Sequence, residues 1–343
     1  IERLINADPN LRVLVTSREP LRLRAEYEFA VPPLSLPSEG ERLSADGLSK
    51  FESIRFFVER AQAVKPEFLL SETNSADVAA ICRSLDGLPF AIELAAARIK
   101  LFEPQTILSR LSSSLKFLTG GAKELPERRQ TMRGAIAWSY DLLSADEKQL
   151  LDRLSVFAGG FTIDSAEAVG AERGGEILDT VSSLLDKNLI ERINQQSGDP
   201  RFRMLVVVRE FALEKLEQSG TSEDVRRRHA VYFAQLVERA EPELRGSRAA
   251  DWLNRLEQEH ENIRLALNWT ISLEPKIALR IAASVHRFWW RRGHLSEGVE
   301  WMRRILDATG KSGDPKLLAS AYRGISSLCW NRGDFDAARS EER

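Results

Sequence analysis

The C-terminal part of the sequence repeats itself, and this repeat constrains the fold more than any other feature. The segment FWWRRGHL at 288–295 matches LCWNRGDF at 328–335, so Trp290 and Gly293 recur as Trp330 and Gly333, forty residues later. Small residues occupy the positions where helices would approach closely: Ala282, Ala283, Ala319 and Ala321. A fixed period of this length indicates stacked helix–turn–helix units. Two units are few for a solenoid, so we expect the array to belong to a longer protein.

The repeat resembles tetratricopeptide arrays, with a slightly longer period. The resemblance implies an α-solenoid that receives a protein partner or a signal. Trp289 and Trp290 are adjacent, so they cannot both face the same side of one helix. Either one packs in the repeat core while the other is exposed for a partner, or both are buried against neighbouring helices.

Near the N-terminus, an apolar run predicts a short buried strand at 12–15 that ends in Thr16-Ser17-Arg18. In open α/β sheets, ligands bind beyond the carboxyl ends of the strands. The guanidinium group suits phosphate oxygens. Arg18 is therefore either a phosphate sensor, with Thr16 and Ser17 beside it, or a solvated arginine at a strand end.

A tight corner between two helices forms the second candidate site. Apolar spacing predicts helices at 49–63 and 76–85, and the sequence Gly87-Leu88-Pro89 follows. Gly87 suits a left-handed residue after a helix, and Pro89 suits the first position of the next helix. Such a corner presents backbone and a flat ring to a base or ribose, although an isolated Gly-x-Pro is usually a plain helix–helix turn.

These two features, in this order, resemble the NB-ARC-like modules of STAND signalling ATPases, especially the bacterial transcriptional-regulator and adenylate-cyclase-linked group. The resemblance continues through WSYDLL at 138–143 and LSVFAGGF at 154–161. It implies that ATP or ADP is bound, with Arg18 at the γ-phosphate and the Gly87-Leu88-Pro89 corner closing over base and sugar, where Gly87 shapes the turn and Pro89 makes the contact.

The sequence departs from this family in one large respect. It contains no G-x-x-x-x-G-K-[ST] phosphate loop, and no acidic strand for Mg²⁺ precedes Arg12. Because the chain opens within a helical pattern, we expect it to be a fragment whose missing N-terminal part supplies both features. The intact parent would then be a candidate ATPase, whereas this chain alone is not expected to hydrolyse ATP.

Residues 119–220 predict a winged helix. A capping box opens a helix at Ser144, a helix is expected at 176–186, and strands at 189–193 and 201–205 form the hairpin wing. The helix before the wing is acidic, which disfavours DNA binding. In the related family a Met-His-Asp motif touches the ADP phosphate, but the matching segment here is Met204-Leu205-Val206. Arg203 or Arg209 could replace the missing histidine, or could simply be solvated.

Composition limits the remaining possibilities. The net charge of −2 gives no general argument for nucleic acid. Cys82 and Cys329 lie far apart and are expected to be free buried thiols in a reducing compartment. The four histidines show no metal-ligand spacing, and no apolar run predicts a membrane span. We expect a cytoplasmic protein.

The predicted fold is mainly α, with a remnant of an α/β P-loop NTPase sheet. Five parts are expected: the remnant at 1–36, a helical domain at 37–118, the winged helix at 119–220, linker helices at 221–275 and TPR-like repeats at 276–343. The linker is expected to consist of two long amphipathic helices, at 223–243 and 249–271. The predicted function is the regulatory portion of an ATP/ADP-dependent switch in a bacterial transcriptional regulator, with DNA contacted only through a domain outside the chain. The alternatives are a nucleotide-independent interaction scaffold and a DNA-binding winged helix.

Overall fold

The computed structural model describes most of the chain, in residues 11–17, 19–24, 26–38, 44–111, 131–170, 177–193, 199–310 and 313–341. The chain forms two compact units. Unit 1 comprises Ile1–Asp152, Leu178–Arg192 and Met204–Lys215, and unit 2 comprises Arg153–Ile177, Ile193–Arg203 and Leu216–Arg343. Among the described residues, we find no helix that is long and apolar enough to cross a membrane.

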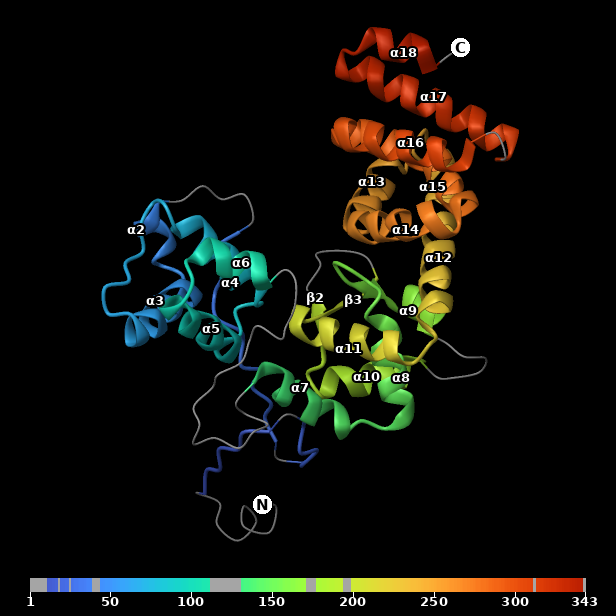
Figure 1. The fold of residues 1–343 in the computed structure, drawn as a ribbon. Coiled ribbons are helices and arrows are strands. Elements are labelled where there is room, and N and C mark those ends of the chain that lie inside the picture. The colour runs from blue at the N-terminus through green and yellow to red at the C-terminus, as the bar shows by residue number, and fades with distance from the viewer. Residues whose placement is uncertain are drawn as a thin grey trace. The chain divides into compact units, whose positions relative to one another are not determined.

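Unit 1 begins with a small helical bundle (Figure 1). Its elements are α2 (Ala45–Leu48), α3 (Glu52–Val64), α4 (Ser75–Ser84), α5 (Pro89–Ala96), the 3₁₀ helix η1 (Ala97–Lys100) and α6 (Pro104–Leu111). Ile54 and Phe57 on α3 are fully buried, as their helical spacing predicts. The two helices expected at 49–63 and 76–85 are thus present as α3 and α4.

The winged-helix elements follow in chain order. They are α7 (Met132–Asp141), α8 (Ala145–Leu154), β1 (Phe161–Thr162), α9 (Ile163–Gly170), α10 (Ile177–Asp186), β2 (Ile190–Ile193), β3 (Arg201–Met204) and α11 (Val206–Gln218). The strand order is β1-β3-β2, and Phe161 of β1 lies opposite Phe202 of β3 in an antiparallel pair. The predicted wing is confirmed, whereas the two-residue β1 is too short to show a period of its own.

The capping box predicted at Ser144 is also confirmed. The Ser144 N–H donates to the Glu147 carboxylate at 2.7 Å, and the Glu147 N–H donates to the Ser144 hydroxyl at 3.2 Å. These reciprocal bonds satisfy two backbone donors at the start of α8.

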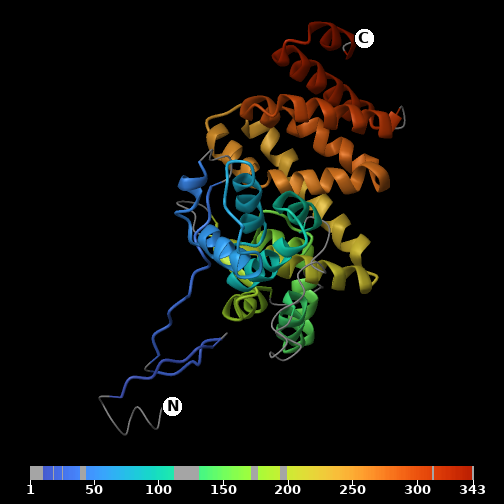
Figure 2. The same cartoon turned by 60° about the vertical axis from the view of Figure 1, so that its left-hand side comes forward.

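Most of unit 2 is a stack of helices (Figures 1 and 2). The helices are α12 (Ser222–Glu243), α13 (Ala249–Gln258), α14 (His260–Leu273), α15 (Pro275–Arg292), α16 (Leu295–Thr309), α17 (Pro315–Arg332) and α18 (Phe335–Glu341). Gly293 and Gly333 end α15 and α17 in the left-handed conformation, at φ 80° and 87°. The helix–turn–helix repeat is therefore present, while its likeness to tetratricopeptide repeats stays a prediction.

The two adjacent tryptophans of the repeat differ in exposure. Trp289 is fully buried, whereas Trp290 is 42% exposed and its repeat counterpart Trp330 is 58% exposed. This confirms the interpretation in which one ring packs in the core and the other faces outward. Cys82 and Cys329 are both buried thiols, as expected.

Two sequence-based predictions are wrong. Residues 11–17 form no strand, and Leu14 is 96% exposed. A buried strand needs neighbours to pair with, and the strands of the described part of the chain belong to the winged-helix sheet. The single helix expected at 249–271 is broken at Glu259 into α13 and α14. The remaining domain boundaries are not tested and stay predictions.

Candidate functional site

The residues predicted at the strand end lie on the surface. Thr16 and Ser17 are exposed in a segment without regular structure. The Ser17 hydroxyl donates to the Glu19 carbonyl at 2.6 Å and accepts the Glu19 N–H at 3.2 Å. Arg18 lies outside the described residues, so its contact with a phosphate stays a prediction.

The Gly87-Leu88-Pro89 corner has the expected backbone geometry. Gly87 adopts φ 68°, and Pro89 stands in the first turn of α5, exposed to solvent. A Cβ at Gly87 would lie 2.4 Å from the Leu34 carbonyl oxygen, and the Leu34 N–H donates to the Gly87 carbonyl at 3.0 Å. The glycine therefore both allows the turn and lets the proline-rich connector pack against it.

Asp86 links this corner to Met204-Leu205-Val206, the segment predicted to lie where the resembled modules carry a Met-His-Asp motif. The Asp86 carboxylate accepts the N–H of Val206, the first residue of α11, at 2.7 Å. A negative group is favourable at a helix N-terminus, where the first N–H groups lack helical partners. The corner and Met204-Leu205-Val206 are thus neighbours within unit 1, although they are 120 residues apart in sequence.

The α10 helix, which precedes the wing, has little free positive charge. Lys187 at its end forms an ion pair with Glu147 at 2.5 Å, and that carboxylate also accepts the Ser183 hydroxyl at 2.6 Å. Asp186 pairs with Arg22 at 3.0 Å. Desolvation raises the pKa of Glu147, but its bonds to Lys187, Ser183 and Ser144 outweigh this and lower the pKa to about 2. The lysine is therefore neutralised by a carboxylate that stays charged.

The wing strand β3 carries two arginines in different environments. Arg201 and Arg203 lie two positions apart, so strand geometry places them on the same face. Arg203 is exposed, whereas the Arg201 side chain is 4% exposed and pairs with Glu259, whose side chain is 6% exposed. A buried arginine needs partners for its donors, and the whole set of partners lies within unit 2.

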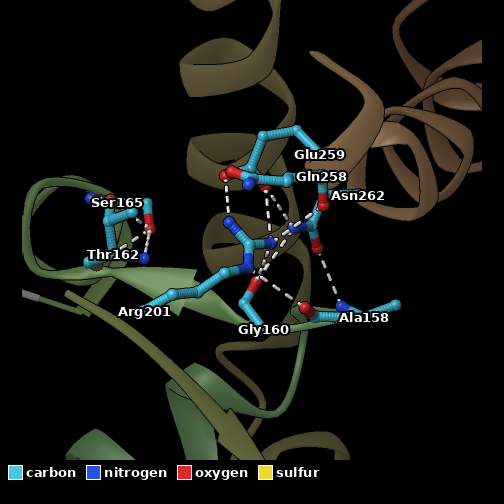
Figure 3. A network of polar contacts seen from close by, with 9 residues as sticks. Ala158, Gly160, Thr162, Ser165, Arg201, Gln258, Glu259 and Asn262 are labelled. Carbon is cyan, nitrogen blue, oxygen red and sulfur yellow. Dashed lines mark hydrogen bonds and ion pairs between the residues drawn. The ribbon is translucent and has the colours of Figure 1, made fainter. Parts of the chain in front are cut away.

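The Arg201 guanidinium is surrounded by acceptors (Figure 3). Its Nη1 donates to Glu259 Oε1 at 2.5 Å, and its Nη2 donates to Glu259 Oε2 at 3.0 Å. The remaining bonds go to backbone carbonyls: Nε to Gly159 at 3.2 Å, and Nη2 to Gly160 at 3.1 Å and Gln258 at 3.0 Å. We call Arg201, Glu259, Asn262 and these carbonyls the Arg201 joint.

Asn262 completes the joint from the first turn of α14. Its Nδ2 donates to Glu259 Oε2 at 2.7 Å and to the Gly160 carbonyl at 3.0 Å, and its Oδ1 accepts the Ala158 N–H at 2.8 Å. The segment before β1 and the start of α14 therefore share hydrogen bonds, as the close-up shows (Figure 3).

The helix ends at the break between α13 and α14 carry partial charges that favour the ion pair between Arg201 and Glu259. Gln258 ends α13, so its carbonyl lies at the negative end of that helix, where Arg201 donates to it. Glu259 immediately precedes α14, so its carboxylate lies at the positive end of the next helix. The ion pair is thus aligned with both helix dipoles.

Two glycines let the segment before β1 approach the guanidinium. Gly159 and Gly160 adopt φ 69° and 103°, a region that disfavours side chains. A Cβ at Gly160 would lie 2.5 Å from the Phe202 carbonyl oxygen. The Gly-Gly pair, noted in the sequence only as part of the family resemblance, therefore aims two carbonyls at Arg201.

Sequence analysis did not identify the joint. Arg201 was expected on the wing, and the alternation with Phe202 and Met204 would place it in solvent. The burial comes from the junction of α13 and α14, where Gln258 and Glu259 lie 57 and 58 residues away in sequence. The clue that was available is the Gly159-Gly160 pair, which marks a close backbone approach. Chemically, the joint holds elements together and offers no open position for a substrate.

Comparison with known proteins supports the winged-helix assignment. Residues 143–217 match a family model described as a winged helix-turn-helix domain. The chain is 35% identical over 311 residues to "Putative HTH-type transcriptional regulator Rv0890c" of Mycobacterium tuberculosis, a match that covers 90% of this chain and 33% of the relative. The corresponding Mycobacterium bovis protein, of the same description, matches equally.

A further relative is "Uncharacterized protein Rv0894" of Mycobacterium tuberculosis, 37% identical over 239 residues, with 68% of this chain and 57% of the relative covered. The chain spans about a third of the length of the regulators it matches.

Proposed function

We propose that this chain is the signal-transmitting portion of a transcriptional regulator. In this proposal the helical repeats of unit 2 receive a signal or a protein partner and pass the change to the winged helix through the Arg201 joint. The regulator class is supported by the relatives described as HTH-type transcriptional regulators and by the winged-helix match.

The observation that carries the proposal is the buried ion pair between Arg201 and Glu259. A buried pair gains little net stability over apolar packing, but losing one partner is costly, so the pair favours one arrangement of the groups around it. Here these groups are the wing strand, the Gly159-Gly160 turn and the break between α13 and α14. Any displacement of that break must therefore move β3 or break the joint.

The proposal includes a nucleotide that sets the state of unit 1. In the intact protein ATP or ADP would be held by Arg18, Thr16 and Ser17, together with the corner Gly87-Leu88-Pro89, and Mg²⁺ by a phosphate-loop part outside the chain. The family resemblance and the exposed Pro89 at a tight corner support this. Calorimetry of the intact protein with ADP and ATP tests it, since a protein that binds neither would be a nucleotide-independent scaffold.

The transmission step is tested by Glu259→Gln in the intact regulator, with Glu261→Gln as the matched control. Glu261 is a surface acid two residues away that pairs with Arg264. We expect Glu259→Gln to shift the transcriptional output in a reporter assay while the control retains the parental output. Parental output from a folded Glu259→Gln protein would contradict the proposal.

A second candidate is DNA binding by the winged helix itself, which the family match favours. The neutralised Lys187 and the buried Arg201 weigh against it, because binding to phosphates needs exposed positive charge. Arg192 and Arg203 on the wing are exposed. Salt-dependent binding of a duplex by this chain, lost on replacing both wing arginines with glutamine, would favour DNA reading over transmission.

A further inference from the structure

Two of the four histidines come together with a carboxylate beside the Arg201 joint, although the sequence shows no metal-ligand spacing. Glu257 of α13, His260 at the start of α14 and His294 between α15 and α16 each place one ligand atom within 4.8 Å of the other two. His294 Nε2 lies 3.2 and 3.4 Å from the two Glu257 carboxylate oxygens. The two imidazole ring centroids are 4.3 Å apart.

The repeat provides an independent reason to single out His294. Its counterpart in the second repeat is Asp334, which accepts the Ala337 N–H at 3.3 Å in the first turn of α18. Aspartate is a favoured helix N-cap, whereas histidine is not. His294 makes no side-chain cap bond to α16 and its ring nitrogen lies against Glu257 instead. The first repeat therefore carries a potential metal ligand at the position where the second repeat carries a capping group.

The ligand set has the chemistry of a transition-metal site. Histidine nitrogens and carboxylate oxygens are both ligands that zinc takes in proteins. Around a tetrahedral Zn²⁺ ion with bonds of 2.0–2.1 Å, ligand atoms lie about 3.3 Å apart. The His294–Glu257 separation already matches this distance, and small side-chain movements would bring His260 into range.

Neighbouring groups hold the cluster from outside. Glu297, which is itself paired with Arg264, lies 3.5 Å from His260 Nε2 and could accept a proton from this nitrogen if Nδ1 holds the ion. The Trp289 Nε1–H donates to the same nitrogen at 3.4 Å and would have to give up this bond. Arg292 lies 3.6 Å from Glu257. A hydrogen-bond acceptor next to a metal-binding histidine orients its ring. The ion would compete with Arg292 for the Glu257 carboxylate.

We propose that Glu257, His260 and His294 bind one divalent transition-metal ion of the zinc class, with water as the remaining ligand. Two imidazoles and one carboxylate suit Zn²⁺ and Co²⁺ better than Ca²⁺ or Mg²⁺, which prefer oxygen ligands alone. The ion would connect the end of α13, the start of α14 and the turn between α15 and α16. This proposal does not depend on the proposed function.

The test is metal binding by the purified chain. Equilibrium dialysis with Zn²⁺ is expected to show one ion bound per chain. Co²⁺ bound in its place is expected to give the visible absorption bands of a four-coordinate ion with nitrogen and oxygen ligands. Glu257→Gln and His294→Asn should each weaken binding at least about tenfold. Asparagine is a good N-cap, so the second variant keeps the start of α16 supported.

Glu261→Gln is the control, because this exposed acid lies next to His260 in sequence and pairs with Arg264. It should bind zinc as the parent does. Absence of binding by the parent at high-micromolar zinc would overturn the proposal, as would parental affinity in both folded ligand variants.

Discussion

Replacing Glu259 with alanine is expected to destabilise unit 2 by about 3–5 kcal/mol, the usual cost of removing one partner from a buried ion pair. The carboxylate accepts from Nη1 and Nη2 of Arg201 and from Nδ2 of Asn262. Without it, the buried guanidinium keeps only its three bonds to the Gly159, Gly160 and Gln258 carbonyls. These acceptors carry no net charge, so they cannot balance the positive charge.

Glu259→Gln separates charge from shape. Glutamine keeps one oxygen that can accept from Arg201 and leaves no cavity, but the variant loses the charge and places an amide NH₂ group where the carboxylate accepted a hydrogen bond. Hydrogen bonds to charged groups contribute about 1.5–3 kcal/mol, against about 0.5–1.5 kcal/mol for neutral pairs. We therefore expect a loss of about 2 kcal/mol, smaller than for alanine.

Hydrogen exchange is the appropriate assay, because a chain with two units need not unfold in one step. Peptides covering β3 and the start of α14 should exchange faster in both Glu259 variants, whereas Glu261→Gln should stay within about 0.5 kcal/mol of the parent. A Glu259→Ala protein that protects these peptides within 1 kcal/mol of the parental protection would refute the argument. The Arg201–Glu259 pair would then contribute as little to stability as an exposed ion pair does.

Other outcomes follow from the same structure. Gly87→Ala should destabilise unit 1 in urea unfolding, because a Cβ would meet the Leu34 carbonyl at 2.4 Å in a left-handed turn. The bonds to Glu147 lower its pKa in the folded protein to about 2 from the ordinary value of 4.5, so its stabilisation of about 3 kcal/mol is present above pH 4.5 and is lost as the pH falls toward 2. Glu147→Gln keeps the capping box, and its melting temperature should fall less than that of the parent between pH 4.5 and pH 2. In the intact protein, Arg18→Ala should weaken ATP discrimination over ADP, and equal preference in variant and parent by calorimetry would count against that role.

The features predicted correctly are those whose cause is local in sequence. The Ser144–Glu147 capping box, the wing strands and the glycines that end α15 and α17 each depend on a few neighbouring residues. The corner at Gly87 and Pro89 belongs to the same class. Capping and left-handed turns are dictated by side-chain chemistry within one helical turn, so a single sequence is enough to locate them.

The features that sequence reasoning missed depend on distant partners. The apolar run at 12–15 suits a strand, but no described strand pairs with it and Leu14 is exposed. The residues around Glu259 suit a continuous helix, because no glycine or proline interrupts them. The break becomes intelligible only once Arg201, 58 residues earlier, is known to be its partner. Tertiary contact has overridden local propensity there.

The same break explains why the joint and the histidine cluster are neighbours. Glu257 and His260 flank Glu259 across the break between α13 and α14, and they take part in the histidine cluster rather than in the joint. Glu259 meets Arg201 of the wing strand, and Glu257 meets His294 of the α15–α16 turn. A metal ion bound to Glu257, His260 and His294 would restrict the movement of the break that positions Glu259 in the Arg201 joint. If both proposals hold, zinc should slow hydrogen exchange in β3 of the parent and should do so much less in Glu259→Gln, where the link between the break and the wing is weakened.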